Sequence, residues 1–361
     1  MKTGAVEKTP LFEGKRILVT GGTGSLGKTL IRRLITGVHG RPAAVIVLSR
    51  DEAKQYDMRL AFMKLRAATE EVIYRDYADV LQFRIGDVRD PASVASALQN
   101  VDIVFNAAAL KQVPSCEYFP TEAVSTNVLG PENIVRCIDQ LRLPVETVIG
   151  ISTDKACKPI NVMGMTKALQ ERVFINANLR CRDTRFVCVR YGNVLASRGS
   201  VVPLFHDQIS SGGPVTITTR EMTRFLLSLN QAVDTIIDAY RIAERGEILV
   251  PRVPASSIVQ LANCLIGTRK IELREVGVRP GEKIHEILVS EDEVYRTVIR
   301  GNYYVVRSLL PELSSNVRTE DAIHEEFSSR THLMSAAETL LMLEREKLRI
   351  EDKPNFRELF G

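Results

Sequence analysis

The sequence is poor in cysteine, and its cysteines show none of the spacings that hold a metal ion or a disulfide framework. The six cysteines include no Cys-x-x-Cys pair, which argues against a zinc site and favours a reducing cytoplasm. Cys188 lies in the apolar run 186–189, where a buried thiol is expected. We therefore predict neither a bound metal nor a disulfide.

Long apolar runs and a charge imbalance are also missing. No segment approaches the roughly 20 apolar residues that cross a bilayer, and residues 1–10 lack the apolar core of a secretion signal. The net charge is only +4, with Lys and Arg spread along the chain, whereas nucleic-acid-binding proteins usually concentrate them in a patch or an arm. These absences predict a cytoplasmic protein with no membrane insertion and no nucleic-acid partner.

Short apolar segments alternate with helical patterns in the first half of the 361 residues. This alternation predicts an α/β fold, a Rossmann-type doubly wound parallel sheet with helices on both faces. The expected strands are 16–20, 44–48, 81–85, 102–106, 145–152 and 185–190, and the expected helices are 26–35, 51–65 and 161–179.

The alternation loosens after about position 195, where glycine and proline separate shorter elements. We predict a cofactor-binding Rossmann domain over residues 10–195, with 225–250 packing back on it. A smaller substrate-binding lobe is expected mainly over 196–310, and a helical extension over 311–361. Within that extension, 334–349 has the pattern of a lone amphipathic helix, with an oligomer contact as its second interpretation.

A glycine-rich segment, 20–27 (Thr-Gly-Gly-Thr-Gly-Ser-Leu-Gly), lies between the first expected strand and helix. This is the context that a dinucleotide-binding loop requires. Gly21 permits a tight turn, Gly24 a close approach of a pyrophosphate, and Gly27 close helix–strand packing, while the helix N-terminus offers N–H groups to the anion. The segment predicts a nicotinamide dinucleotide held by Gly21, Thr23, Gly24, Ser25, Leu26 and Gly27.

The end of the second strand indicates which dinucleotide is bound. Ser49 and Arg50 precede Asp51 there. An arginine at this turn can hold the 2′-phosphate of NADP, whereas an acid would bind the 2′-hydroxyl of NAD. NADP is favoured, and the alternative has Arg50 in solvent with Asp51 on the ribose. Further cofactor contacts are expected at the ends of the next two strands, from Asp87, Val88, Asn106, Ala107 and Ala108.

Several motifs together resemble a known family. The glycine loop, Asn106 to Ala109, Asn127 and a lysine after the fifth strand resemble the extended short-chain dehydrogenases. Further motifs make the chain similar, over about residues 15–310, to the UDP-N-acetylglucosamine 4,6-dehydratases of polysaccharide biosynthesis. These motifs are 49–52 (Ser-Arg-Asp-Glu), 109–114 (Ala-Leu-Lys-Gln-Val-Pro), 152–156 (Ser-Thr-Asp-Lys-Ala), 190–194 (Arg-Tyr-Gly-Asn-Val) and 279–283 (Arg-Pro-Gly-Glu-Lys).

The resemblance implies a lyase reaction in three steps. Hydride leaves sugar C4 for NADP⁺, water is eliminated across C5 and C6, and the same hydride returns to C6. It also implies that Asp154 protonates the leaving hydroxyl and that Lys155 removes the C5 proton, beside Thr153. NADP would stay tightly bound and be recycled, with Asn127, Lys167 and Tyr191 among its contacts. Members that invert C5 and members that retain it share these motifs.

Met163 departs from the general family pattern. The wider family carries Tyr-x-x-x-Lys here, whereas this chain has Met163 and Lys167 at those positions. A thioether cannot accept a proton, so Met163 is not the base at C4. Lys155, Thr153 and a water are the remaining candidates. Some dehydratases of the capsule type also carry methionine, so the substitution points to that branch.

The substrate is expected to be a UDP-sugar. Lys111 follows the fourth strand, near the expected hexose, and Arg224 and Arg279 are candidate phosphate ligands because arginine binds anionic oxygens in a bidentate manner. By resemblance, Asn193 is placed at the pyrophosphate, Arg198 and Val201 at the uridine, and Glu282 at the ribose. The resemblance also implies a homo-oligomer, with hexamers among the known forms.

Two functions other than 4,6-dehydration remain possible for this sequence pattern. A nucleotide-sugar 4-epimerase would use the same scaffold, but ordinary epimerases keep the tyrosine and lack Thr-Asp-Lys. A non-catalytic NADP-binding regulatory protein is supported only by the missing tyrosine, and Asp154, Lys155 and Lys167 oppose it.

Overall fold

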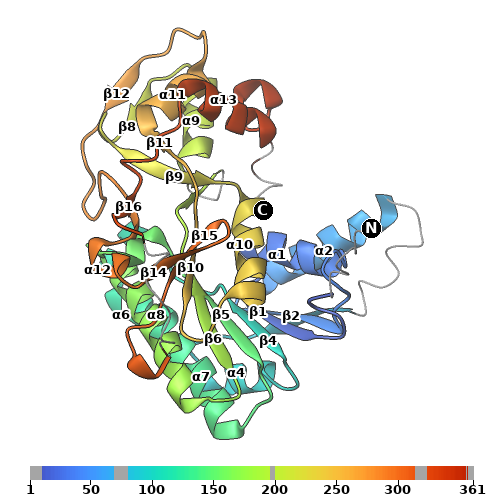
Figure 1. Cartoon of the computed structure of the whole chain (residues 1–361). Helices are drawn as coiled ribbons and strands as arrows, with labels where there is room; N and C mark the ends of the chain where they lie inside the picture. Colours follow the sequence, from blue (N-terminus) through green and yellow to red (C-terminus); the bar gives the residue numbers. More distant parts are fainter. Residues whose placement is uncertain (1–9, 69–79, 196–199, 314–322, 355, 357–361) are drawn as a thin grey trace, which may run out of the picture.

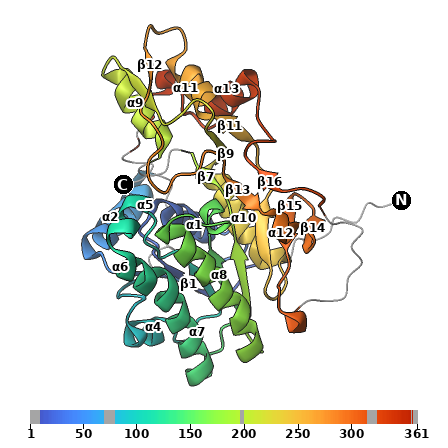
Figure 2. The ribbon, with the colours of Figure 1, turned by 90° about the vertical axis from the view of Figure 1, so that its left-hand side faces the viewer.

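The computed structural model describes residues 10–68, 80–195, 200–313, 323–354 and 356, which form a large sheet domain and a smaller lobe (Figures 1 and 2). The large sheet has nine strands in the order β14-β15-β10-β6-β5-β4-β1-β2-β3. Its parallel strands are β1 (Arg16–Thr20), β2 (Ala44–Ser49), β3 (Leu81–Ile85), β4 (Ile103–Asn106), β5 (Thr147–Ile151), β6 (Arg185–Val189) and β10 (Ile248–Pro251). The order 3-2-1-4-5-6 is that of a Rossmann sheet, which confirms the predicted fold class.

Helices cover both faces of this sheet (Figure 1). One face carries α1 (Ser25–Ile35), α2 (Glu52–Ala68) and α10 (Leu229–Ile242), and the other carries α4 (Pro91–Ala97), α7 (Gly130–Leu141) and α8 (Val162–Arg180). Because both faces are covered, the central strands are almost continuously apolar and form the main core. Between β4 and α7 the chain forms α5 (Val113–Tyr118), α6 (Pro120–Val124) and the π-helical turn η1 (Ser125–Leu129).

A hairpin from the range expected for the lobe extends the large sheet instead. Strands β14 (Thr297–Arg300) and β15 (Tyr303–Val306) are antiparallel, and β15 pairs with β10. The turn between them contains Gly301, whose φ of 58° favours glycine. The chain therefore returns from the lobe to the sheet domain, to which α10 and β10 also belong.

The lobe has its own core. It contains a three-stranded sheet of β7 (Asn193–Val194), β9 (Thr223–Leu227) and β11 (Ala255–Ser257), and a pair of β8 (Val215–Ile217) and β12 (Leu273–Glu275). Helices α9 (Val201–Ser210), α11 (Ile258–Ile266) and α13 (Ala336–Arg345) bury apolar side chains between them. The expected C-terminal helix is thus α13, and it packs on α11 through the buried Met342 and Leu343.

Short elements connect the two parts. Strands β13 (Ile287–Val289) and β16 (Phe327–Ser328) pair between the lobe and the sheet domain (Figure 2). The helix α12 (Glu291–Val294) follows β13, and single turns are η2 (Asp154–Ala156), η3 (Pro311–Leu313) and η5 (Ile350–Asp352). The turn η2 contacts both α8 and β13, which places it where sheet domain and connecting strands meet.

Candidate active site

The glycine loop packs against the end of β4. Gly21 has a φ of 65°, and a Cβ there would lie 2.8 Å from the backbone of Ala108. A Cβ on Gly27 would lie 2.5 Å from the Cα of Gly22, so α1 and the loop meet too closely for any side chain. At Gly24 a Cβ would meet only the Gly21 carbonyl, at 3.4 Å. Two of these glycines are therefore required by packing, while Gly24 faces open space at the start of α1.

A cavity of about 570 Å³ adjoins this loop at the carboxyl ends of the first four strands. It lies at the point where the strand order reverses, which is where ligands bind in open α/β sheets. Its wall includes many of the residues predicted to hold the cofactor, namely Gly21, Thr23, Ser49, Arg50, Asp87, Val88 and Ala108. The hydroxyls of Thr23 and Ser49 lie 3.0 Å apart and connect two of these strand ends.

Charged residues at the rim of this cavity have defined partners. Asp51 accepts a hydrogen bond from the Lys54 backbone at 3.0 Å and also pairs with the Lys54 ammonium. Asp87 accepts bonds from the Arg89 backbone and Nε at 2.9 and 2.8 Å. Arg50 lies 3.7 Å from Asp87 and is half-exposed. Of these groups, the Arg50 guanidinium is the one with most of its donors left for a ligand.

Asn127 connects the loop after β4 with α8. Its amide accepts a bond from the Leu110 N–H at 2.8 Å and donates to the Leu110 carbonyl and the Thr166 hydroxyl at 2.9 and 3.0 Å. The side chain is fully buried. Both of its N–H donors are thus used within the protein, so Asn127 positions the loop that follows the cavity.

The turn η2 presents the predicted acid and base. Thr153 caps the turn, and its hydroxyl donates to Oδ1 of Asp154 at 2.7 Å. Nζ of Lys155 donates to the same oxygen at 3.1 Å. Asp154 is 1% exposed, and its second oxygen, Oδ2, is buried without a partner. Buried carboxylate oxygens are normally hydrogen-bonded, so an unpaired one marks a place for a ligand or a water.

Glu286, which the sequence analysis did not identify, lies on the other side of Lys155. It precedes β13, is 1% exposed, and its Oε1 lies 3.2 Å from Nζ of Lys155. Its Oε2 has no partner. Burial lowers the pKa of Lys155, but the carboxylates of Asp154 and Glu286 outweigh burial, and the pKa lies above its ordinary value. Lys155 is therefore an ammonium in the unliganded protein.

Arg224 has different partners from those expected of a phosphate ligand. Its guanidinium donates to the carbonyls of Thr223, Ile284 and Lys283 at 2.7, 3.0 and 2.9 Å. Its Nε lies 3.8 Å from Glu286. Most of its donors are thus committed to the segment that carries Glu286, which makes Arg224 a positioning residue in this state.

The 279–283 segment folds over the start of α8. Gly281 has a φ of 80°, and its carbonyl accepts a bond from Asn161 at 2.8 Å. Lys283 donates to the Cys157 carbonyl at 2.6 Å, and burial lowers its pKa. Arg279 is exposed, whereas Glu282 is half-buried with Oε2 unpaired.

Met163 and Lys167 lie one turn apart on α8 and are both buried. Met163 packs in a small apolar cluster with Cys116 and Ala123. Lys167 donates to Gln170 at 2.6 Å and to the carbonyl of Ile151, the last residue of β5. Burial lowers the pKa of Lys167 to about 8.

Gly164 explains why α8 can approach η2. A Cβ at this position would lie 2.2 Å from the Lys155 carbonyl. The helix and the acid–base turn are therefore in backbone contact, and any side chain at Gly164 would displace Lys155.

The predicted substrate residues surround the same region. Lys111 is exposed after β4, Asn193 begins β7, and Val201 begins α9. Arg198 lies outside the described residues.

Tyr191 is buried, and its backbone carbonyl accepts a hydrogen bond from the Asp154 N–H at 3.0 Å. Burial raises the pKa of the Tyr191 hydroxyl. Buried polar atoms without partners recur in this region, on Asn106, Thr126, Asp154, Asn193, Ser200, Glu282 and Glu286.

The cysteines form no disulfide among the described residues. All six are free, and five are buried. Among the residues with described placement, no cluster of His, Cys, Asp or Glu could hold a metal ion. Within those same residues, no helix is long and apolar enough to span a bilayer.

The Rossmann sheet, the glycine loop and the lysine-bearing helix define an extended short-chain dehydrogenase. A family model described as "Polysaccharide biosynthesis protein" matches residues 17–308. The chain belongs to this family, and with it to the nucleotide-sugar dehydratases and epimerases.

Individual relatives are similar over most of the chain. A protein of Rickettsia bellii named "UDP-glucose 4-epimerase" is 44% identical over 299 residues, which cover 81% of this chain and 83% of that protein. The X-ray structure of Pen from Bacillus thuringiensis is 32% identical, with a TM-score of 0.82 over 93% of this chain and 99% of that one. DesIV, a dTDP-glucose 4,6-dehydratase from Streptomyces venezuelae, shares the fold at 22% identity, with a TM-score of 0.62 over 74% and 86% of the two chains.

Proposed function

We propose that the chain is an NADP-dependent UDP-N-acetylglucosamine 4,6-dehydratase, whose product is a UDP-2-acetamido-2,6-dideoxy-4-hexulose. The observation that carries the proposal is the pair of buried Asp154 and part-buried Lys155 in η2, with Oδ2 of Asp154 unpaired. Eliminating water from a sugar requires an acid for the leaving hydroxyl and a base for the proton on carbon. This pair supplies both groups at the carboxyl end of β5.

The residues around the 570 Å³ cavity fit NADP. The first N–H groups of α1 have no side-chain cap and can hold the pyrophosphate. Arg50 can bind the 2′-phosphate, and Asp51, which also lines the cavity, is paired with Lys54. Lys167 is expected near the nicotinamide ribose. When bound, the dinucleotide supplies the hydride acceptor and donor that 4,6-dehydration requires.

Asp154 and Lys155 together hold the proton that the elimination needs. Moving one proton across their 3.1 Å hydrogen bond turns the ion pair into a carboxylic acid and a neutral amine, with no change of net charge. The amine of Lys155 then takes the C5 proton, and the C5–H electron pair forms the C5–C6 double bond. The C6–O bond breaks, and the oxygen takes the proton of Asp154 and leaves as water. The original ion pair is restored.

Glu286 is proposed as a positioning residue for this exchange. Its carboxylate holds the Lys155 ammonium from the side opposite Asp154. A nearby negative charge favours the charged form of a lysine, so Glu286 opposes the transfer to Asp154 until the substrate binds. Arg224, 3.8 Å from Glu286, and Lys283 are the cations that face this group.

The base at the 4-hydroxyl is proposed to be one of the two residues that contact Asp154, or a water. Met163 has no lone pair of sufficient basicity. Lys155 remains the first candidate, Thr153 the second and a water the third. The 2.7 Å bond from Thr153 to Asp154 supports a role for Thr153, because its hydroxyl could pass a proton to that carboxylate.

The UDP-sugar is proposed to lie between the sheet domain and the lobe. Lys111 would contact the hexose, Asn193 the pyrophosphate, and Arg198 and Val201 the uridine. Arg279 and Glu282 would contact the nucleotide from the segment over α8. The unpaired buried oxygens of Asn193 and Glu282 support this assignment, since each requires a hydrogen-bond partner that the protein does not supply.

A 4-epimerase is the second candidate, because the rickettsial relatives at 44% identity carry that name. An epimerase needs a base only at the 4-hydroxyl, which Lys155 could supply, but it has no departing hydroxyl for Asp154 to protonate. A non-catalytic NADP-binding protein would leave the acid–base pair of Asp154 and Lys155 without a task.

Incubation with UDP-N-acetylglucosamine and NADP, followed by mass spectrometry, distinguishes the candidates. A dehydratase gives a product lighter by one water. Unchanged mass with a new galacto isomer would identify an epimerase, and unchanged substrate would favour the binding protein.

A further inference from the structure

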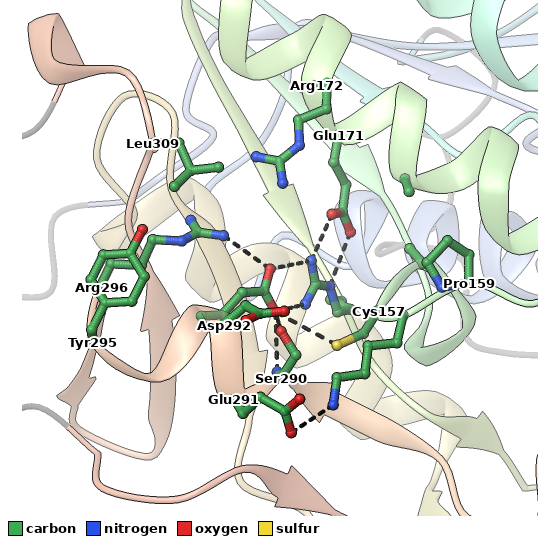
Figure 3. A pocket seen from close by; sticks show the side chains of 15 residues that line it. Cys157, Pro159, Glu171, Arg172, Ser290, Glu291, Asp292, Tyr295, Arg296 and Leu309 are labelled. Atoms are coloured by element: carbon green, nitrogen blue, oxygen red, sulfur yellow. Dashed lines mark hydrogen bonds and ion pairs between the residues drawn. The ribbon is translucent and has the colours of Figure 1, made fainter.

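A second cavity lies between α8 and the segment 290–296, and neither Asp154 nor Lys155 lines it (Figure 3). Its volume is about 660 Å³. One wall is the chain just after the acid–base turn, residues 156–159, and the other walls come from α8, α12 and Leu309. The cavity therefore adjoins the candidate active site without belonging to it.

The floor of this cavity is a buried charge network that is complete around Arg190. Its Nε and Nη2 donate to Glu171 at 3.1 and 2.7 Å. Its Nη1 donates to Glu293 at 2.8 Å and to the Leu288 carbonyl at 2.9 Å, and its Nη2 also reaches Glu293 at 3.2 Å. Arg190 is 2% exposed. All five of its N–H groups are used, so Arg190 has nothing to offer a ligand.

Arg296 completes the network, but one of its N–H groups has no hydrogen-bond acceptor. It is 8% exposed, and it donates to Glu293 at 3.1 Å and to the Arg307 carbonyl. Its Nε is buried without a partner. The carboxylate of Glu293 cannot serve Nε, because it already accepts bonds from Arg190, Arg296 and Ser290. A buried guanidinium with an unused donor requires an acceptor from elsewhere.

Arg172 adds a second cation at the mouth. It follows Glu171 on α8, is exposed, and has no hydrogen bond or ion pair with any other described residue. Figure 3 shows its guanidinium extending from α8 towards Leu309, with no partner drawn. Burial and the nearby charge of Arg172 both lower the pKa of Arg296, whereas the carboxylate of Glu293 raises it. The two guanidiniums thus repel each other across the cavity.

We propose that this cavity binds the phosphoryl group of a small molecule between Arg172 and Arg296. A phosphate oxygen would give Nε of Arg296 its missing acceptor, and its negative charge would offset the repulsion between the two guanidiniums. Within the network, Glu171 and Glu293 are already balanced by Arg190 and Arg296. Lys158 is paired with Glu291 at 2.8 Å. Asp292, exposed on the α12 wall, opposes an anion. Salt screens the attraction between the anion and the exposed Arg172, so we expect binding to weaken as salt is added.

The cavity is connected to the candidate active site through the backbone of Cys157. Cys157 lines the cavity, and its carbonyl accepts the bond from Lys283, which faces Glu286 and Lys155. A phosphoryl compound seated here would contact the peptide that continues directly from Lys155. The proposed phosphoryl site therefore lies beside the acid–base turn and is distinct from the proposed nucleotide-sugar site.

Calorimetric titration of the full chain with inorganic phosphate, and separately with UMP, tests the proposal. Both titrations are made without added NADP or UDP, because these carry phosphoryl groups themselves. Binding at the cofactor and uridine sites is identified as the part that the Arg172→Gln variant leaves unchanged. We expect saturable binding of phosphate. Binding of UMP as well would show that a nucleotide fits, whereas binding of phosphate alone would limit the site to a free anion.

The variant Arg172→Gln removes the exposed cation without touching the buried network. We expect a loss of affinity of roughly tenfold or more, the usual effect of losing a charged hydrogen bond. The matched control is Arg180→Gln, which lies on the same helix, is exposed and pairs with Glu132 at 3.3 Å. It should bind phosphate as the native chain does. Absence of saturable binding, or equal affinity in Arg172→Gln and the native chain, would overturn the proposal.

Discussion

The ammonium of Lys155 lies between two buried carboxylates, 3.1 Å from Asp154 and 3.2 Å from Glu286. The two acids come from distant parts of the chain, the end of β5 and the segment before β13. Their joint effect is a raised pKa for Lys155 despite its burial. The base in the proposed elimination is therefore charged at rest, and its proton must pass to Asp154 before it can act.

The variant Lys155→Ala should abolish product formation, because no other described amine contacts Asp154. Binding of NADP, measured by fluorescence titration, should persist, since Lys155 does not line the cofactor cavity. The matched control is Lys158→Ala, three residues further on and paired with Glu291 and Glu326 at 2.8 and 2.9 Å. Near-native turnover by Lys155→Ala would remove Lys155 from the mechanism.

The variant Glu286→Gln should shift the pH dependence of turnover. Removing this charge lowers the pKa of Lys155, because one of the two carboxylates that raise it is lost. The pair of Asp154 and Lys155 then loses its shared proton at lower pH, so the alkaline fall in kcat begins earlier. A pH–rate profile measures the shift, with the exposed Glu291→Gln as control. An unshifted profile with reduced activity would mean that Glu286 acts only through packing.

Met163 should contribute through packing alone. Met163→Ala leaves a cavity in the cluster with Cys116 and Ala123 and should lower the free energy of unfolding by roughly 2–5 kcal/mol. Met165→Ala, on the same helix but half-exposed, should cost much less. Denaturant melts measure both. A Met163→Tyr variant whose turnover rose steeply would show that the missing phenol limits the reaction.

Arg50 should decide the choice of cofactor. Arg50→Ala is expected to weaken NADP binding by roughly tenfold or more, through loss of a charged hydrogen bond to the 2′-phosphate, and to leave NAD binding nearly unchanged. Fluorescence titration with both cofactors gives the ratio, and Arg32→Ala, exposed on α1, serves as the control. Equal losses for the two dinucleotides would show that Arg50 does not bind the 2′-phosphate.

Much of the sheet domain could be predicted because its elements carry local signals. The expected strands 16–20 and 81–85 have the observed bounds, and the helix expected at 161–179 is observed one residue later, with Asn161 as its cap. Burial on both faces makes such strands continuously apolar, which a sequence shows directly. The hairpin of β14 and β15 was not placed in this sheet, because no local pattern tells which sheet a late hairpin will join.

The candidate site could be predicted only where its residues lie next to a strand end. Asp154 and Lys155 follow β5 directly, so their position was visible in the sequence. Glu286 reaches Lys155 from the connecting segment before β13, and Arg224 turns to backbone carbonyls, because tertiary packing brings these segments together. The sequence signal that could have pointed to Glu286 is its place beside the Arg-Pro-Gly-Glu-Lys motif. The spacing of residues in that motif does not tell which side chains they contact in the fold.

One measurement tests the central claim most directly, the NMR spectrum of the product formed from UDP-N-acetylglucosamine in deuterated water with NADP present. The account predicts a 4-keto sugar with a methyl group at C6 and solvent deuterium at C5, because Lys155 removes the C5 proton and water leaves from C6. A product that keeps its C6 hydroxyl and its C5 proton and differs only in configuration at C4 would contradict it and identify an epimerase.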